Sequence, residues 1–208
     1  MDENSCGECI KFRDKVNKID INKNKIVHGF GNWNSEILFI GEGPGRWGAA
    51  ITSIPFTKDS SGRIVQKALV KLEFSNNNYE DINKKFRPAE SSLKCVLTNV
   101  FRCYSYKIVN NEEMEQKYRL HCLEHLKNEV NKINNLKKII IIGKDSTKKL
   151  MDSYLNELRE KYDTKVITHP SYFKNFFYQN HKHLSEDECV LKFIEEFESK
   201  NKEIEIIA

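Results

Sequence analysis

Two side chains with acid–base capacity directly follow apolar runs in this sequence. Glu42 lies inside the glycine-rich segment Gly41–Gly45, after the run Ile37–Ile40, and His169 follows Thr168 at the end of another run. A carboxylate in a glycine-rich loop would repel a phosphate, and no Lys-Ser/Thr pair follows the last glycine, so the segment does not fit a phosphate-binding loop. The carboxylate instead favours water handling or a cationic transition state. An imidazole can stabilise a developing anion, although a lone histidine is often structural.

Four of the six cysteines have a spacing that favours a metal site. Cys6 and Cys9 form a C-x-x-C pair near the N-terminus, and Cys103 and Cys122 lie far along the chain. Four thiolates can hold zinc or an iron–sulfur cluster, and the spacing alone does not choose between them. A thioredoxin-type redox pair is disfavoured because this C-x-x-C precedes the first strand.

Short apolar runs alternate with amphipathic stretches along the chain. The runs are continuously apolar, which predicts strands buried on both faces; they are Ile37–Ile40, Cys95–Leu97, Lys138–Ile142 and Lys165–Thr168. The amphipathic stretches predict helices over Gly62–Phe74, Glu112–Ile133, Asp145–Glu160 and Ser185–Ser199. This alternation predicts an α/β fold with a parallel sheet covered by helices on both faces. No boundary splits the chain, so we expect residues 1–208 to form one domain.

The predicted topology indicates where a site would lie. Right-handed crossovers bring the carboxyl ends of the four strands to one edge of the sheet, where α/β proteins build their sites. The segments that follow the strands are Gly41–Gly45, Thr98–Val100, Gly143–Ser146 and Thr168–Ser171. We therefore expect the chemistry of this protein to be concentrated in these four segments.

Charge is unevenly distributed along the chain. The formal net charge is +4, but Leu184–Ala208 holds eight acidic and three basic residues, a net −5, which leaves +9 on Met1–His183. A body of that sign attracts polyanions, and nucleic acid is the commonest one, although a lysine-rich chain with solvated faces has the same charge. No apolar run approaches the roughly 20 residues that cross a bilayer. The acidic start Met1–Asn4 does not fit a secretory signal, so we expect a soluble cytoplasmic protein that binds no membrane.

Taken in order, these segments resemble the iron–sulfur uracil-DNA glycosylases, the family-4 type of the uracil-DNA glycosylase superfamily. The resemblance runs from Cys6 to about Tyr172, and it is specific because each motif keeps its place relative to the strands and cysteines. The motifs are the C-x-x-C pair, Gly41–Gly45, Pro55-Phe56, Ser61–Arg63, Thr98–Val100 with Cys103 after it, Cys122, Ile142–Lys144 and Thr168–Tyr172.

The resemblance implies a fold, a cofactor and an activity. The fold is a three-layer α/β/α sandwich with a central four-stranded parallel sheet. The cofactor is a [4Fe–4S] cluster, with zinc as the alternative, and its ligands are Cys6, Cys9, Cys103 and Cys122. The activity is that of a monofunctional DNA-repair enzyme, which flips uracil out of single- or double-stranded DNA and hydrolyses its N-glycosidic bond. We expect the protein to act as a monomer.

The resemblance also implies a role for individual residues. Glu42 positions the attacking water, and His169 donates a hydrogen bond to the departing uracil. The residues implied to bind the base are Gly41, Gly43, Phe56 and Asn99, where Phe56 stacks on the ring and Asn99 reads its polar edge. The residues implied to contact DNA are Pro170, Ser171 and Tyr172.

The sequence departs from the family pattern at two places. The acidic pair that usually follows the Gly-Pro-Gly motif is replaced by Gly48-Ala49, and Ile108 stands where the family has a second asparagine. Because the acidic pair helps to line the pocket near the base, its loss leaves the exclusion of thymine open. Two alternatives follow from these departures: a catalytically weak module that binds damaged DNA, and a glycosylase with altered base specificity.

Overall fold

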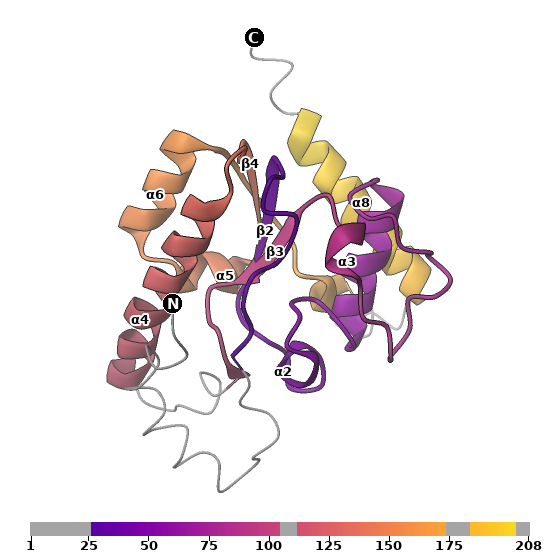
Figure 1. Cartoon of the computed structure of the whole chain (residues 1–208), viewed down its shortest axis with the longest axis horizontal. Coiled ribbons are helices and arrows are strands. Elements are labelled where there is room, and N and C mark those ends of the chain that lie inside the picture. The colour runs from indigo at the N-terminus through magenta and orange to yellow at the C-terminus, as the bar shows by residue number, and fades with distance from the viewer. Residues whose placement is uncertain (1–25, 105–111, 174–183, 203–208) are drawn as a thin grey trace, which may run out of the picture.

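The structure is a computed structural model that describes residues 26–104, 112–173 and 184–202. Its centre is a five-stranded sheet with the order β1-β3-β2-β4-β5 (Figure 1). The strands are β1 (Phe30–Gly31), β2 (Ile37–Gly41), β3 (Val96–Asn99), β4 (Lys138–Ile142) and β5 (Asp163–Ile167). Strands β2 to β5 pair in parallel, which confirms the predicted parallel sheet. The prediction lacked β1, which pairs antiparallel to β3 and is too short to have a sequence pattern.

Helices cover both faces of the sheet. They are α2 (Ala49–Thr52), α3 (Ser60–Lys71), α4 (Glu112–Lys132), α5 (Lys144–Lys149), α6 (Asp152–Lys161) and α8 (Glu186–Lys202), with a 3₁₀ turn at Glu90–Ser92. In Figure 1, α3 and α8 lie on one side of the sheet, and α4 and α6 lie on the other. The molecule is therefore a three-layer α/β/α sandwich.

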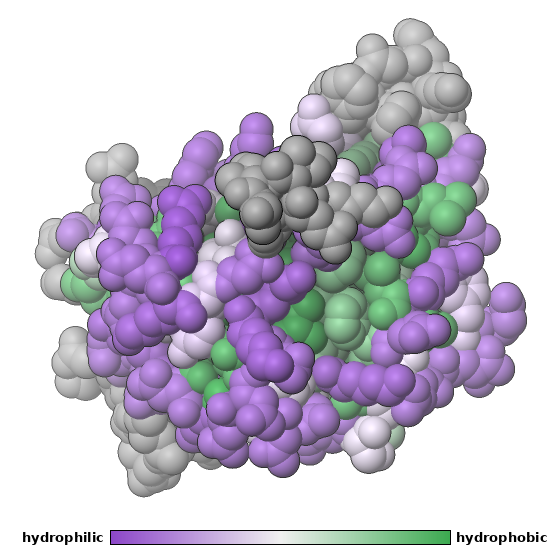
Figure 2. Space-filling view, turned by 90° about the horizontal axis from the view of Figure 1, so that it is seen from above, coloured by the Kyte–Doolittle hydropathy of each residue, from purple (hydrophilic) through white to green (hydrophobic). Residues whose placement is uncertain are grey.

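Two apolar cores separate the three layers, because successive residues of a strand point to opposite faces. Phe39 of β2 packs with α3 and with Phe193 of α8 in the first core. Its neighbour Leu38 packs with Leu126 of α4 and with α6 in the second core. Both β2 residues are fully buried, as the continuous apolar runs predicted. The hydrophilic residues lie outside these cores and surround the apolar ones on the face in Figure 2.

The helix predicted over Asp145–Glu160 is two helices in the structure. Leu150 and Met151 separate α5 from α6 with extended backbone conformations, at ψ 145° and 138°. The break allows Leu150 to enter the second core, where it is 2 % exposed. Tertiary burial therefore overrides the helical pattern of the sequence at this point.

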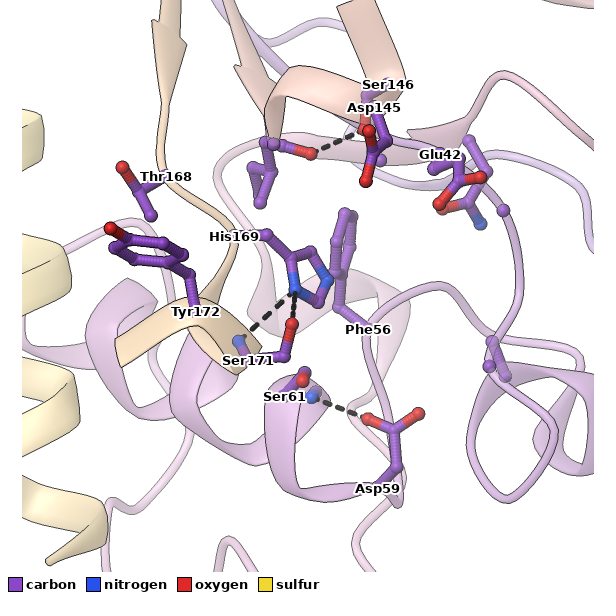
Figure 3. Close-up of a pocket in the computed structure, with 18 of the residues that line it drawn as sticks. Glu42, Phe56, Asp59, Ser61, Asp145, Ser146, Thr168, His169, Ser171 and Tyr172 are labelled. Carbon is purple, nitrogen blue, oxygen red and sulfur yellow. Dashed lines mark hydrogen bonds between the residues drawn. The ribbon is translucent and has the colours of Figure 1, made fainter. Parts of the chain in front are cut away.

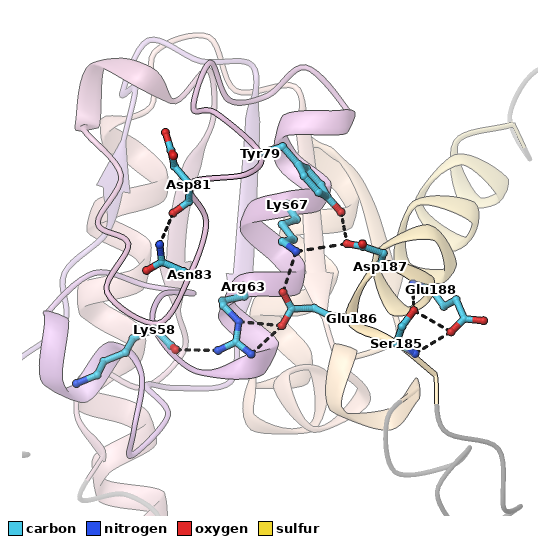
Figure 4. A network of polar contacts seen from close by, with 10 residues as sticks. All are labelled: Lys58, Arg63, Lys67, Tyr79, Asp81, Asn83, Ser185, Glu186, Asp187 and Glu188. Carbon is cyan, nitrogen blue, oxygen red and sulfur yellow. Dashed lines mark hydrogen bonds and ion pairs between the residues drawn. The ribbon is translucent and has the colours of Figure 1, made fainter.

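A polar network joins α3 to the start of α8 (Figure 4). Glu186 accepts a hydrogen bond from Arg63 Nε at 2.8 Å and forms an ion pair with Lys67 at 3.0 Å. Asp187 accepts a hydrogen bond from the Tyr79 hydroxyl at 2.5 Å. The basic face of α3 thus holds the acidic first turn of α8. No helix of the described residues combines the length and apolarity that a membrane span requires.

Candidate active site

A cavity of about 770 Å³ lies at the carboxyl ends of the parallel strands (Figure 3). The residues singled out from the sequence that line it are Gly41, Glu42, Gly43, Phe56, Asn99, His169, Ser171 and Tyr172. The structure therefore brings the carboxylate, amide, imidazole and aromatic ring to one place. Pro170 is buried and does not line the cavity. Tyr172 is 55 % exposed and stands at the cavity rim.

Gly41 is the point where Asn99 and Phe56 approach each other. Gly41 and Asn99 are paired in the register of β2 and β3. A β-carbon on Gly41 would lie 2.7 Å from Asn99 Oδ1 and 2.7 Å from Phe56 Cζ, which is too close for any side chain. A side chain at this position would displace the amide or the ring, so glycine allows both to lie on one wall.

The Asn99 amide is buried and incompletely hydrogen-bonded. The residue is 3 % exposed, and its Nδ2 has no hydrogen-bond partner in the described part of the chain. A buried donor without an acceptor costs about 1–3 kcal/mol. Since this amide belongs to the cavity wall, a ligand carbonyl in the cavity would remove that cost.

Glu42 is held in place by its backbone. The carbonyl oxygen of Glu42 accepts a hydrogen bond from Phe101 N at 2.9 Å, and that of Gly41 accepts one from Val100 N at 2.8 Å. These bonds continue the pairing of β2 and β3 beyond the ends of both strands. They fix the loop from which the half-buried Glu42 carboxylate lines the cavity (Figure 3).

His169 has a defined proton position. Its Nδ1 accepts a hydrogen bond from Ser171 N at 3.2 Å and lies 2.7 Å from Ser171 Oγ (Figure 3). Because Nδ1 accepts from a backbone N–H, the proton of the neutral ring must be on Nε2. The ring thus offers Nε2–H as a donor to a ligand.

Helix α8 and the turn at Gly143 hold the residues around His169. Thr168 donates two hydrogen bonds to Glu196 Oε1 of α8, from its backbone N at 2.9 Å and from its hydroxyl at 2.8 Å. Gly143, with φ +95°, lies so close that its β-carbon would stand 3.1 Å from His169 Cβ. Thr168 and His169, the two residues after β5, are therefore held by α8 and by the turn at Gly143.

The cavity also includes Asp59, which the sequence reasoning did not single out. Asp59 caps α3, since its Oδ1 accepts a hydrogen bond from Gly62 N at 2.7 Å. Its Oδ2 lies where β-carbons on Gly45 and Gly48 would stand, so the glycine-rich loop packs directly on this carboxylate. An Asp-Ser-Ser-Gly sequence is an N-cap signal that predicts the cap, although not its contact with the loop.

Two of the four predicted cluster ligands, Cys103 and Cys122, lie among the described residues but outside the cavity wall. Cys103 and Cys122 are 5 % and 3 % exposed, respectively, and neither lines the cavity. The other two predicted ligands, Cys6 and Cys9, lie outside the described residues. Among the described residues, no group of three or more metal-ligating side chains is assembled.

A buried cation lies next to Cys103. Arg102 is 2 % exposed, and its Nη1 lies 2.7 Å from Thr98 Oγ1 and 2.7 Å from Glu129 Oε2. Its Nε and Nη2 are buried without an acceptor in the part of the chain that the structure describes. Burial lowers the pKa of His125, and the charge of Arg102 lowers it further. Glu129 balances the charge of Arg102, and two donors of the guanidinium remain without an acceptor among the described residues.

The fold and this cavity define an α/β protein with a cavity at the carboxyl ends of its parallel strands, lined by polar and aromatic groups. The chain belongs to the uracil DNA glycosylase superfamily, whose family model matches residues 28–198. It is similar in structure to the wild-type SMUG2 of Pedobacter heparinus, with a TM-score of 0.51 and 14 % sequence identity. That similarity covers 81 % of this chain and 77 % of the other. No curated protein matches the sequence.

Proposed function

We propose that this protein is a monofunctional uracil-DNA glycosylase, which releases uracil from DNA and leaves an abasic site. The observation that carries this proposal is the buried Asn99 amide on the cavity wall, whose Nδ2 has no partner among the residues that the structure describes. A ligand with a carbonyl oxygen would satisfy an amide in this state. Membership of the superfamily supports the proposal.

Asn99 is the residue that would read the base. Uracil presents a carbonyl at position 4 and an N–H at position 3, so that Asn99 Nδ2 would donate to the first and Oδ1 would accept from the second. Cytosine presents the opposite pattern at both positions. An amide with one fixed orientation therefore accepts uracil and rejects cytosine, because the wrong base leaves buried polar groups unpaired.

Phe56 would replace the stacking that the base loses when it leaves the duplex. A base inside a duplex is out of reach, and flipping it into a pocket costs a few kcal/mol. Stacking on an aromatic side chain recovers roughly 1–3 kcal/mol per base. The Phe56 ring lines the same wall as Asn99, so one base can contact both.

The hydrolysis follows from the two remaining groups. Cleavage of the bond between C1′ of the sugar and N1 of uracil leaves positive charge on the sugar and negative charge on the base. His169 Nε2–H would donate to uracil O2 and stabilise the anion. The Glu42 carboxylate would stabilise the cationic sugar and orient a water for attack at C1′. The water oxygen bonds to C1′ as the C1′–N1 bond breaks. One water proton passes to the Glu42 carboxylate and from there to the uracil anion, and the other stays on the new C1′ hydroxyl.

DNA would approach from the rim of the cavity. Lys144 and Lys148 line it and can attract phosphates, as can the net positive charge of the chain outside the acidic C-terminal segment. Ser171 and the exposed Tyr172 are placed for contacts with the strand. We propose that the protein binds uracil-containing DNA, single- or double-stranded, as a monomer.

We further propose that Cys6, Cys9, Cys103 and Cys122 hold a [4Fe–4S] cluster. The described residues fit such a group. Cys103 and Cys122 are buried, and Arg102, next to Cys103 in the chain, has two buried donors without acceptors within the described residues. A cluster with four thiolates is anionic, and its sulfur atoms accept hydrogen bonds. When bound, the cluster would join the N-terminal segment to the residues after β3 and to α4 and stabilise the fold.

Release of uracil from oligonucleotides tests the proposal directly. Single-stranded, U·A and U·G substrates are incubated with the wild type, with Asn99→Ala and with Asn34→Ala, an exposed asparagine outside the cavity that serves as the control. We expect alkali-labile sites with the wild type and Asn34→Ala, and at least a 100-fold slower reaction with Asn99→Ala.

The same substrates discriminate the alternatives. If the folded, cluster-loaded wild type leaves all three substrates intact, the proposal is wrong. Binding to abasic DNA without release would then identify a damaged-DNA-binding module, which the loss of acids at Gly48-Ala49 favours. Release of a base other than uracil would identify altered specificity.

A further inference from the structure

We infer that Gln66 is a positioning residue for this site, because it holds Phe56 in the conformation that places its ring on the cavity wall. The effect of Gln66 on base binding rests on the proposed function, whereas its effect on the conformation of Phe56 does not. Gln66 lies on α3, is 1 % exposed, and does not line the cavity. It can therefore act on a ligand only through another residue.

Phe56 has a backbone conformation that needs support. Its φ is +52°, in the left-handed region that bulky side chains rarely adopt. Such a residue keeps its conformation only where the surrounding structure determines it, and strain of this kind gathers at functional sites. The ring of Phe56 would change direction if the backbone relaxed to an ordinary negative φ.

Gln66 supplies the side-chain bond to this strained residue. Its Nε2 donates a hydrogen bond to the Phe56 carbonyl oxygen at 3.1 Å. The first turn of α3 packs on the same peptide, since a β-carbon on Gly62 would lie 2.7 Å from both Phe56 C and Thr57 N. Thr57 is fixed on the other side, where its hydroxyl donates to Ile54 O at 2.8 Å. The peptide that follows Phe56 is thus held by α3 on one side and by the bond of Thr57 to Ile54 on the other.

The oxygen of the Gln66 amide also indicates that the bond to Phe56 is the reason for an amide at this position. Its Oε1 is buried and has no hydrogen-bond partner within the described residues. A buried amide that is half-satisfied is unfavourable, and an apolar side chain of the same length would fill the site without that cost. The bond to Phe56 is the contact that accounts for an amide at this position.

Displacement of Phe56 would change the cavity directly. Phe56 Cζ and Asn99 Oδ1 both lie 2.7 Å from the place of a Gly41 β-carbon, so that the ring and the amide share one wall. A ring that leaves this position can no longer stack on a base that Asn99 holds. Gln66 should therefore affect binding of the flipped base, and its effect should depend on the presence of the Phe56 ring.

A double-mutant cycle tests this dependence. Gln66→Met keeps the length of the side chain and removes the donor. We expect Gln66→Met to weaken binding of an oligonucleotide with 2′-fluoro-2′-deoxyuridine, which resists hydrolysis, and to lower kcat/KM about tenfold. In the Phe56→Ala background, the same substitution should change either quantity less than twofold. Ser35→Ala, which removes a buried hydroxyl bond to Ile37 O outside the cavity, is the control and should change neither.

Two results would overturn the inference. One is a folded Gln66→Met protein with wild-type binding and turnover, and the other is an equal loss with and without the Phe56 ring. If the wild type itself neither binds nor cleaves the uracil oligonucleotides, the proposed function fails. The role of Gln66 in holding Phe56 is then tested by a crystal structure of Gln66→Met. In that structure we expect Phe56 with a negative φ and its ring away from Gly41; an unmoved Phe56 overturns the inference.

A second variant covers the case in which Gln66→Met does not fold. Gln66→Glu keeps the shape and loses the donor only while the carboxyl group is ionised. Burial raises the pKa of a carboxyl group, and the protonated form regains an O–H that can donate to the Phe56 carbonyl. We expect the binding of Gln66→Glu relative to the wild type to improve as the pH falls. A ratio that is independent of pH contradicts the inference.

Discussion

Asn99 lies directly beside Gly41 in the parallel pairing of β3 and β2. The Asn99 amide and the Phe56 ring both occupy space that a side chain on Gly41 would need. The two strands therefore do more than form the core. Their register sets the distance between the group that would read a base and the backbone against which the base would lie.

Gly41→Ala tests this arrangement. Its methyl group would lie 2.7 Å from Asn99 Oδ1 and displace the amide or the Phe56 ring. We expect at least a 100-fold slower release of uracil, measured on a single-stranded oligonucleotide, with unchanged affinity for an oligonucleotide that lacks uracil. A variant that is folded by circular dichroism and releases uracil at the wild-type rate would contradict the geometry.

Ser171→Ala tests the proton position on His169. The substitution removes the hydroxyl that lies 2.7 Å from Nδ1 and weakens the preference for the Nε2–H form. We expect a decrease in kcat of about tenfold, and a larger decrease of about 10²-fold or more for His169→Ala. Ser61→Ala, which alters another hydroxyl of the cavity, is the matched control. An equal effect of the two serine substitutions would argue against a special role for Ser171.

Glu129→Ala tests the buried ion pair next to Cys103. The substitution leaves the Arg102 guanidinium buried without its carboxylate, and breaking such a pair costs about 3–5 kcal/mol. It also removes the acceptor of Gly29 N, at 2.7 Å from Glu129 Oε1. Urea denaturation should show this loss. Glu36→Ala breaks the exposed pair with Lys137 and should cost less than about 1 kcal/mol.

Acid sensitivity is expected from the network between α3 and α8. Burial raises the pKa of Glu186, but the hydrogen bonds and charges of Arg63 and Lys67 outweigh it and hold that pKa below its ordinary value of 4.5. A carboxyl group with a pKa lowered by folding stabilises the folded state above its unfolded pKa, and this stabilisation disappears as the pH falls through the folded pKa.

Melting temperatures between pH 7 and pH 3 measure this effect. The wild type should lose stability below about pH 4.5, and Glu186→Gln should be less stable at pH 7 but lose less on acidification. Glu195→Gln alters an exposed pair with Lys192 and should follow the wild-type profile. If Glu186→Gln has the same slope as the wild type, the network does not contribute to acid sensitivity.

The cofactor proposal predicts a coloured protein. Preparation without oxygen should give absorption near roughly 400 nm, as iron–sulfur clusters show, and Cys103→Ser or Cys122→Ser should abolish it. Cys189→Ser replaces a buried cysteine of α8 and should leave the absorption unchanged. A colourless protein with one bound zinc per chain would assign the four cysteines to zinc instead.

The sequence predicts the strands and the edge of the sheet where the cavity lies better than it predicts the contacts between side chains. The strands β2, β3 and β4 could be recognised from continuous apolar runs and are buried as predicted. Strand β5 forms near the predicted place, but four of its five residues are only half-buried because it lies at the edge of the sheet. Parallel topology places the residues after these strands at one edge. Asn99, Glu42 and His169 all line the cavity there because each ends a strand or follows one within two residues. The roles of these residues stay predictions until the variants above are measured.

Other features depend on contacts that no local pattern encodes. The left-handed φ of Phe56 and its bond to Gln66 arise from the way α3 packs on the loop before it. The ion pair of Arg102 with Glu129 joins β3 and α4, which lie far apart in the chain. The split of the helix at Leu150 follows from burial in the second core, since the residues on both sides favour a helix.

The two-residue strand β1 has a consequence for association between molecules. An edge strand has unpaired backbone donors and acceptors that can pair with another chain. Proteins prevent this by making edge strands short, by placing charged residues on them or by covering them. On one side β1 pairs with β3 for two residues and then ends. On the other side β5 carries Asp163 and Lys165, which pair with each other at 3.5 Å. The short strand β1 at one edge and the charged residues of β5 at the other therefore oppose aggregation by strand addition.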